Sequence, residues 1–330
     1  MRVVEFQEYG GPEVLRPVRA EVPRPGPGQV TVDVAYAGVN FADLKARSEG
    51  YRVPTLPYVP GLEVSGTVRA VGAGVTGLTP GQQVAALTAG GGYAEVALAE
   101  AGTVFALPPG LDLRTAATLP TVLPTAHALL HEVGRLRAGE SVLVHGAAGG
   151  VGTVAGQLAR AAGAGAVYGV VSSAAKAAYA RGFGYHDVFV DSGVEGSDFA
   201  EQVGRATGGR GVDLLLDPVG GATLRRGLGA LAVYGRLVSY GNAGGEPPWQ
   251  LGQSDLATHG RSVAGFSILT LARTDPGALR ALAERAFRTV TEGGVELPVT
   301  AEFPLDRAAE AHELMGSRTS TGKLLLRVAQ

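Results

Sequence analysis

The sequence contains no cysteine, and this absence excludes several kinds of chemistry. The chain can form no disulfide bond, thiolate nucleophile, iron–sulfur cluster or zinc site with cysteine ligands. It also lacks an excess of either charge, since 28 basic residues stand against 30 acidic ones. A chain so close to neutrality presents no long-range field that attracts nucleic acid or an anionic membrane surface. We therefore expect no nucleic-acid partner and favour a small ligand.

Long hydrophobic runs are also few. The stretch 141–159 carries no charge apart from the titratable His145, and its length approaches the roughly 18 residues of a membrane span. Glycines interrupt this stretch and no aromatic belt flanks it, so a buried strand, a glycine-rich turn and a helix explain it better. The first eight residues carry charges and lack the apolar core of a signal peptide. We expect a cytoplasmic protein with no membrane association.

The overall composition is that of a globular protein. Hydrophobic residues make up 45% of the 330 residues and charged residues 18%, with a mean hydropathy of +0.16. This composition supplies a large core and excludes a mainly disordered chain. The length exceeds the size at which single cores stop growing, so we expect about two domains.

The pattern of short apolar runs changes along the chain. The first third predicts strands at 29–37, 63–71, 83–87 and 92–96, bounded by turn residues. From residue 140, apolar strands alternate with helices, as a parallel sheet covered on both faces requires. The expected strands there are 141–146, 166–173, 187–191, 212–217, 236–241 and 262–267, and the expected helices are 151–162, 176–183, 198–207, 222–231 and 276–292. The tail predicts strand, helix and strand, which are too little to stand alone and should complete the N-terminal β domain.

The segment SVLVHGAAGGVG places glycines between an apolar strand and a helix. Gly149, Gly150, Val151 and Gly152 are the candidate phosphate-binding residues, because small residues let the backbone approach a pyrophosphate and a helix N-terminus offers free amides. Alanine at 147 replaces the first glycine of the usual pattern. The alternative is a tight turn that only packs the helix on the strand.

The end of the next strand indicates which dinucleotide binds. An NAD-binding domain places an acidic residue there against the ribose hydroxyl, whereas this chain has Ser172 and Ser173, followed by Lys176. Two hydroxyls and a cation suit a ribose 2′-phosphate, so we favour NADPH over NADH. A simply solvated Lys176 remains the alternative.

Several segments together resemble one family. They are GGPEVL (10–15), GVNFADL (38–44), PYVPGLEVSGTV (57–68), GAAGGVG (146–152), DPVGG (217–221), GRLVSYGNAGG (235–245) and SRTSTGKLLL (317–326). The whole chain resembles the zinc-free quinone oxidoreductase branch, similar to ζ-crystallin, of the medium-chain dehydrogenase/reductase superfamily.

The resemblance implies an α/β chain of two domains. A GroES-like β-rich catalytic domain would comprise residues 1–122 and 268–330, and a Rossmann domain with a doubly wound parallel sheet would comprise residues 123–267. NADPH would bind between them, and the chain would form a homodimer. In zinc-dependent relatives a cysteine occupies the position of Asn40 and a histidine that of Leu62, so the resemblance and the composition both predict a site without metal.

The resemblance also assigns two catalytic candidates. Tyr51 matches a substrate-pocket tyrosine that donates a proton in some enoyl reductase relatives, and a phenol keeps its proton at neutral pH. Its alternative is a tyrosine at the pocket rim that only shapes the pocket. Asn40 matches an asparagine that contacts the nicotinamide ribose and the floor of the site. Its alternative is a residue that caps the helix beginning at Phe41.

Further cofactor contacts follow from the resemblance. They are Thr125 beside the nicotinamide, Tyr240, Gly241 and Asn242 in a loop over the cofactor, Phe266 and Ser267 at the carboxamide, and Arg318 in the C-terminal segment, with Lys323 as a less certain neighbour. Two positions depart from the family. His127 replaces a more usual tyrosine, and we expect it to pack rather than act as an acid. Asp191 replaces a tyrosine that helps to hold the 2′-phosphate, and its charge weakens the NADPH assignment.

The expected function is an NADPH-dependent reductase of quinones or other α,β-unsaturated carbonyl compounds. Its alternative within enzymes is an enoyl-thioester reductase in polyketide or fatty-acid-like synthesis. Binding of AU-rich RNA, an abundant structural role and a pure NADPH sensor are the non-enzymatic alternatives, and near-neutral charge argues against RNA.

Overall fold

The structure is a computed structural model that describes residues 1–192 and 198–328. The chain forms two compact units, which are described separately. The β unit comprises residues 1–124, 268–291 and 297–330, and the α/β unit comprises residues 125–267 and 292–296.

The β unit is built mainly from antiparallel strands, with one parallel pair, β14 and β15, and helices between the strands. Its strands are β1 (Arg2–Glu5), β2 (Arg16–Arg19), β3 (Gln29–Val39), β4 (Glu63–Val71), β5 (Gln83–Leu87), β6 (Val96–Glu100), β7 (Val104–Ala106), β14 (Val299–Pro304) and β15 (Lys323–Arg327). Its helices are α1 (Phe41–Glu49), α2 (Leu113–Ala116), α9 (Ile268–Thr274), α10 (Pro276–Thr291) and α11 (Ala308–Gly316), with 3-10 turns at Pro12–Val14, Ala101–Thr103 and Leu305–Arg307. Helix α3 (Leu119–His127) contains the boundary between the units.

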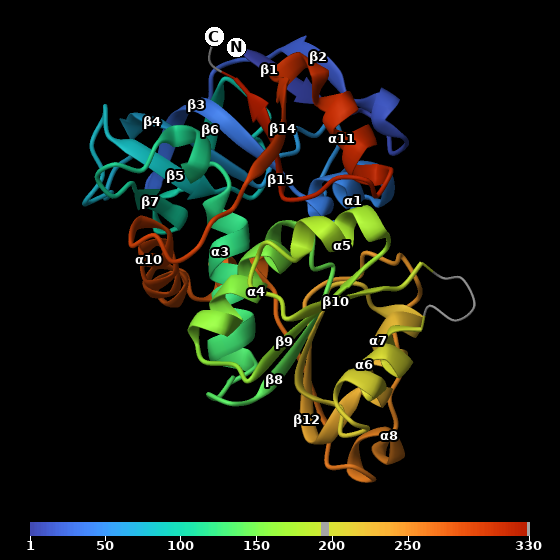
Figure 1. Ribbon diagram of the computed structural model, residues 1–330. Coiled ribbons are helices and arrows are strands. Elements are labelled where there is room, and N and C mark those ends of the chain that lie inside the picture. Colours follow the sequence, from blue (N-terminus) through green and yellow to red (C-terminus); the bar gives the residue numbers. More distant parts are fainter. Residues whose placement is uncertain (193–197, 329–330) are drawn as a thin grey trace. The chain divides into compact units, whose positions relative to one another are not determined.

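Strands β1 and β2 form a small sheet of their own, and the other strands from the N-terminal and C-terminal parts of the chain share one larger sheet. Its strand order is β14-β15-β3-β4-β5-β7, and β6 also pairs with β3. Strand β15 lies antiparallel to β3, with Leu324 opposite Val39 and Arg327 opposite Tyr36, so the red and blue strands are adjacent in Figure 1. The predicted return of the tail to the N-terminal β domain is confirmed.

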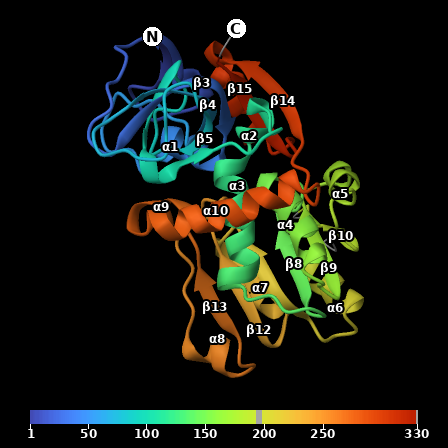
Figure 2. The same ribbon diagram turned by 90° about the vertical axis from the view of Figure 1, so that its left-hand side faces the viewer.

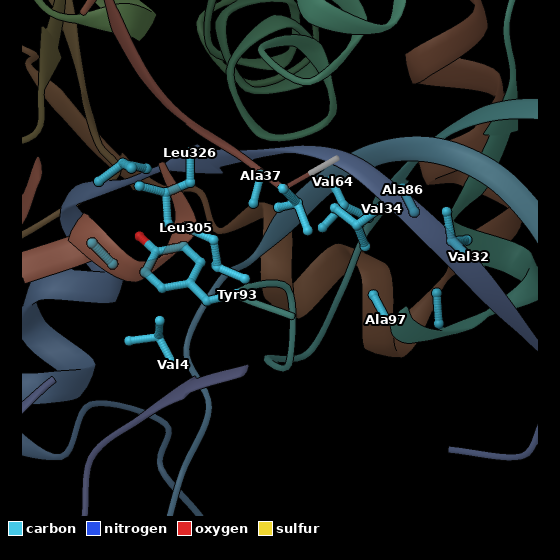
Figure 3. Packing of buried hydrophobic residues seen from close by; sticks show 14 of the residues in the cluster. Val4, Val32, Val34, Ala37, Val64, Ala86, Tyr93, Ala97, Leu305 and Leu326 are labelled. Carbon is cyan, nitrogen blue, oxygen red and sulfur yellow. The ribbon is translucent and has the colours of Figure 1, made fainter. Parts of the chain in front are cut away.

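Aliphatic side chains fill the interior of the β unit. Figure 3 shows part of this core, in which Val4, Tyr93, Leu305 and Leu326 come from distant parts of the chain. Burying these side chains supplies the main stabilisation of a sheet that would otherwise expose one face to water.

The strand predicted at 92–96 is wrong. The strand β6 begins only at Val96, because the residues before it bond elsewhere. Tyr93 donates its amide proton to Pro60 and accepts one from Val4, and Glu95 donates to Arg2. The amides of these residues are thus bound to β1 and to a loop, and pairing with β3 begins only at the Glu95 carbonyl, which accepts the Val34 amide proton at 2.9 Å.

The α/β unit contains a six-stranded parallel sheet. Its strands are β8 (Ser141–His145), β9 (Ala166–Val171), β10 (Asp187–Val190), β11 (Val212–Asp217), β12 (Leu231–Ser239) and β13 (Ser262–Gly265). Their order is β10-β9-β8-β11-β12-β13 and every pair is parallel. This is the order of a doubly wound Rossmann sheet, with the topological switch at β8, so that prediction is confirmed.

Helices connect these strands and pack on the sheet. They are α4 (Gly150–Ala161), α5 (Ala174–Ala180), α6 (Phe199–Ala206), α7 (Gly221–Gly229) and α8 (Gln253–Ala257), preceded by a π-helical turn at Ala128–Val133. Helix α4 contacts β8 and β9, and α7 contacts β12 (Figure 2). All five residues of β8 are buried, as expected for a strand covered on both faces. No helix in the described part of the chain has the length and apolar character needed to cross a membrane.

Candidate functional site

The glycine-rich turn joins the central strand β8 to helix α4. Gly146 starts the turn with a φ of 67°, a conformation that favours glycine. The first backbone hydrogen bond of the helix runs from the Thr153 amide to the Gly149 carbonyl, at 2.8 Å. The amides of Gly150, Val151 and Gly152 precede that bond, so they have no acceptor within the helix. They form the kind of amide cluster that binds phosphate oxygens.

The two glycines at the ends of this cluster have different surroundings. A β-carbon on Gly152 would lie 2.3 Å from the Gly146 carbonyl oxygen and 2.7 Å from the Ala147 Cα, so only glycine fits there. A β-carbon on Gly149 would approach only the Gly146 oxygen, at 3.4 Å. The Tyr185 hydroxyl donates to the Gly152 carbonyl at 2.6 Å and fixes the first turn of the helix. Gly152 therefore serves packing, whereas the surroundings of Gly149 leave more room.

The other candidate residues of the α/β unit gather at one edge of the sheet. Ser172 and Ser173 follow β9, Tyr240, Gly241 and Asn242 follow β12, and Phe266 and Ser267 follow β13. Carboxyl ends of parallel strands share an edge, and ligands of doubly wound sheets bind there. Thr125 lies in the C-terminal half of α3, and its side chain is buried.

The end of β9 presents hydroxyl and ammonium groups. Ser172 is exposed, and Ser173 and Lys176 are half-buried. The Ser173 hydroxyl oxygen accepts the Lys176 amide proton at 3.3 Å, which leaves its own proton to donate to another group. This set fits a ribose 2′-phosphate, and Lys176 would contribute charge to it.

His145 and Asp217 form a buried pair at the ends of the adjacent strands β8 and β11. The Asp217 carboxylate accepts protons from the amides of Val219, at 3.1 Å, and Gly220, at 2.9 Å. The same carboxylate lies 3.0 Å from His145 Nδ1, at the end of β8. Asp217 therefore shapes the DPVGG turn and ties it to the strand that precedes the glycine-rich turn.

A separate cavity of about 550 Å³ lies in the β unit, and Tyr51 lines it. The residue is 43% exposed. Arg52 Nε donates to the Tyr51 hydroxyl oxygen at 3.2 Å, and another guanidinium nitrogen donates to Thr270 at 3.2 Å. Leu62 contributes an apolar wall.

Asn40 lies at the start of α1 but does not cap that helix with its side chain. Its Nδ2 donates to Glu63 at 2.9 Å, and its Oδ1 accepts from Lys323 at 2.8 Å. Asn40 is nevertheless the N-cap residue of α1: Asp43 accepts the Asn40 amide proton at 2.9 Å and donates its own amide proton to the Asn40 carbonyl at 3.0 Å. The alternative, in which Asn40 stabilises the start of this helix, therefore stands beside its side-chain contacts with Glu63 and Lys323.

Asn40 belongs to a buried charged cluster. Lys323 Nζ donates to Glu63 Oε1 and, at 3.1 Å, to the Val39 carbonyl. Burial raises the pKa of Asp43 to about 7, while hydrogen bonds from the Asn40 and Gly61 amides and the charge of Lys323 oppose that rise. Asp43 also lines the cavity, so a carboxyl group with a raised pKa borders it.

The structure brings most but not all of the predicted residues together. The candidates of the α/β unit share one sheet edge, whereas Asn40 is buried in the charged cluster and Tyr51 lines the cavity. Arg318 is exposed in the turn after α11, and Lys323 is buried in its ion pair with Glu63.

Sequence reasoning missed Arg52, Asp43 and Glu63 as members of these sites. A signal was present for Glu63, because an acidic residue opens the otherwise uncharged stretch EVSGTV. Lys323 gives a matching signal, since it immediately precedes three leucines. Buried charges of opposite sign require partners.

Two family models match the chain. The model described as alcohol dehydrogenase GroES-like domain matches residues 26–109, and the one described as zinc-binding dehydrogenase matches residues 150–284. A GroES-like unit and a Rossmann sheet in one chain define a medium-chain dehydrogenase or reductase. The expected fold class is confirmed.

Relatives define the branch within that class. A quinone oxidoreductase of Rattus norvegicus is 34% identical over 99% of this chain and 97% of its own length. The crystal structure of Escherichia coli quinone oxidoreductase complexed with NADPH is 32% identical, with a TM-score of 0.91 over 99% of this chain and 100% of that one. A phthioceranic/hydroxyphthioceranic acid synthase of Mycobacterium tuberculosis is 36% identical over 93% of this chain but only 14% of the synthase. The chain belongs to the quinone oxidoreductase branch of the medium-chain dehydrogenase/reductase superfamily, as its sequence motifs predicted.

Proposed function

We propose that this chain is an NADPH-dependent reductase that transfers hydride to a quinone or another α,β-unsaturated carbonyl compound. The observation that carries the proposal is the amide cluster of residues 150–152 at the topological switch of a Rossmann sheet, next to Ser172, Ser173 and Lys176. The NADPH complex of the Escherichia coli quinone oxidoreductase supports the choice of cofactor.

The chain's own residues would bind the cofactor in parts. The amides of Gly150, Val151 and Gly152 would hold the pyrophosphate, with space beside Gly149, and the end of β9 would hold the 2′-phosphate. For the ribose and nicotinamide we propose Asn40, Thr125, Tyr240, Gly241, Asn242, Phe266, Ser267 and Arg318, on the strength of the family resemblance. When bound, NADPH supplies the hydride, and the protein supplies position and hydrogen bonds.

Tyr51 would act on the acceptor oxygen. Since Arg52 Nε already donates to the phenol oxygen, the phenol's own proton is directed to another acceptor. An acceptor carbonyl in the cavity could receive that proton as negative charge develops on its oxygen. We propose that this happens without a metal, because the sequence has no cysteine and Leu62 lines the cavity where zinc-dependent relatives carry a histidine.

The second candidate is reduction of an enoyl thioester. The segment of the mycobacterial synthase that matches 93% of this chain supports it, as does the exposure of Tyr51 beside the cavity. Enoyl thioesters are less readily reduced than quinones, so a proton donor would matter more for them.

The test compares NADPH oxidation with a naphthoquinone and with a crotonyl thioester, for wild type and Tyr51→Phe. Tyr234→Phe is the matched control, because Tyr234 is a 77% exposed tyrosine of the α/β unit. We expect turnover of the quinone by both proteins. A loss of about 10²-fold or more in kcat that is confined to the thioester would identify Tyr51 as its proton donor. No turnover of either acceptor would contradict both candidates.

Two further properties of the protein are proposals, namely its oligomeric state and its location in the cell. A homodimer follows from the family resemblance, and light scattering on the purified chain tests it. A cytoplasmic location is the second, and fractionation of cells that express the chain tests it.

A further inference from the structure

Asp191 is an acidic residue at the sheet edge where the proposed 2′-phosphate would bind, and a carboxylate there would disfavour that binding. The residue follows β10, which pairs with β9 so that Val190 is opposite Val171. The Asp191 amide donates to the Val171 carbonyl at 2.8 Å, so Asp191 lies at the same sheet edge as Ser172. An unpaired carboxylate at this edge would repel a dianionic phosphate over several ångströms.

Arg226 of helix α7 supplies a counter-charge. One of its terminal nitrogens lies 2.8 Å from Asp191 Oδ2, and the other lies 3.6 Å from Asp198 Oδ1. The Asp191 side chain is only 11% exposed, which limits screening of this pair by solvent. Arg226 therefore compensates the charge of Asp191, its nearer carboxylate partner, although the more distant Asp198 shares the same guanidinium.

A buried ring fixes the position of Arg226. The guanidinium carbon lies 4.9 Å from the centroid of Phe199, the first residue of α6. Phe199 is fully buried, and helices α6 and α7 contact each other. Arg226 is thus held against a rigid surface by a cation–π contact and two carboxylates.

We infer that Arg226 is a positioning residue for coenzyme specificity, which permits NADPH to bind by neutralising Asp191. It acts through Asp191 and needs no contact with the coenzyme. The inference rests on the proposed function, because it presumes that a 2′-phosphate binds at Ser172, Ser173 and Lys176. It explains how the chain accommodates an acid where a neutral residue would be expected.

The test is equilibrium titration of the full-length chain with NADPH and with NADH, followed by nicotinamide fluorescence. Arg226→Gln should weaken NADPH about tenfold and change NADH less than threefold, because only NADPH carries the repelled phosphate. The double variant Arg226→Gln/Asp191→Asn should recover wild-type NADPH affinity to within about threefold. Arg226→Lys should retain the preference, since it keeps the charge.

Two controls keep the test decisive. Arg225→Gln changes the neighbouring arginine, which lies 3.4 Å from Asp255, and should leave both affinities unchanged. If Arg226→Gln does not fold, Arg226→Met retains the alkyl contact with Phe199 and removes the charge, so the same loss for NADPH is expected.

Other outcomes would overturn the inference. Equal weakening of NADPH and NADH would mean that Arg226 only stabilises the fold. A double variant that stays weak for NADPH would mean that Arg226 itself binds the phosphate. Unchanged NADPH affinity in Arg226→Gln would show that the pair has no bearing on specificity. Failure of the wild type to bind either coenzyme would contradict the proposed function as well.

Discussion

At the scale of single residues, the glycines of the glycine-rich turn have different surroundings, although the sequence pattern does not tell them apart. A β-carbon on Gly152 would clash with backbone atoms, whereas one on Gly149 would meet only the Gly146 carbonyl oxygen, at 3.4 Å. A pattern of glycines predicts that small residues are needed, but it does not show which of them packs the helix and which leaves room for a ligand.

Gly152→Ala should therefore destabilise the chain even without coenzyme. The added methyl group would lie 2.3 Å from a carbonyl oxygen that cannot move without opening the turn. We expect a loss of about 1–3 kcal/mol in the free energy of unfolding, measured by denaturant titration. Gly149→Ala is the matched control, because its methyl group meets no atom closer than 3.4 Å and its φ of −83° suits alanine. Equal losses for the two variants would contradict this assignment.

At the scale of elements, a buried ion pair joins strands that are distant in sequence. Glu63 begins β4 and Lys323 begins β15, and both side chains are almost fully buried. The amide of Thr121 also donates to Glu63, at 2.8 Å, so the carboxylate connects the sheet to helix α3. The cluster is one reason why the C-terminal strand has a defined place in the sheet.

Removing one charge of the Glu63–Lys323 ion pair should lower the free energy of unfolding more than removing both charges. Lys323→Met leaves the Glu63 charge buried and unpaired, so we expect a loss of about 3–5 kcal/mol in the free energy of unfolding. The double variant Lys323→Met/Glu63→Gln should be clearly more stable than the single variant, as measured by denaturant titration. Additive losses in the double variant would show that the two side chains do not stabilise each other.

At the scale of the whole molecule, much of the architecture could be predicted because it depends on periodicity. Apolar runs separated by helices predicted the parallel sheet, and β4, β5 and β11 have the predicted bounds. The tail was predicted to return because it is too short to fold alone, and β15 does pair with β3. The strand at 92–96 was predicted wrongly, since periodicity does not reveal that Tyr93 and Glu95 bond to other segments.

The partners of the charged residues could not be predicted from the sequence. Asp191 was interpreted as a repulsive acid, but its partner Arg226 lies 35 positions further along the chain. Asn40 was singled out as a site residue, but its hydrogen bonds to Glu63 and Lys323 could not be predicted, because they depend on strand register. A sequence shows which residues carry charge, whereas the fold decides which charges meet.

The central claim is that the chain binds NADPH through its amide-rich turn and needs no metal to do so. Titration calorimetry of the chelator-treated full-length chain with NADPH and NADH tests it most directly. We predict stoichiometric binding of NADPH, tighter than that of NADH. The absence of binding heat with either coenzyme, or binding of NADPH that returns only when zinc is restored, would contradict the account.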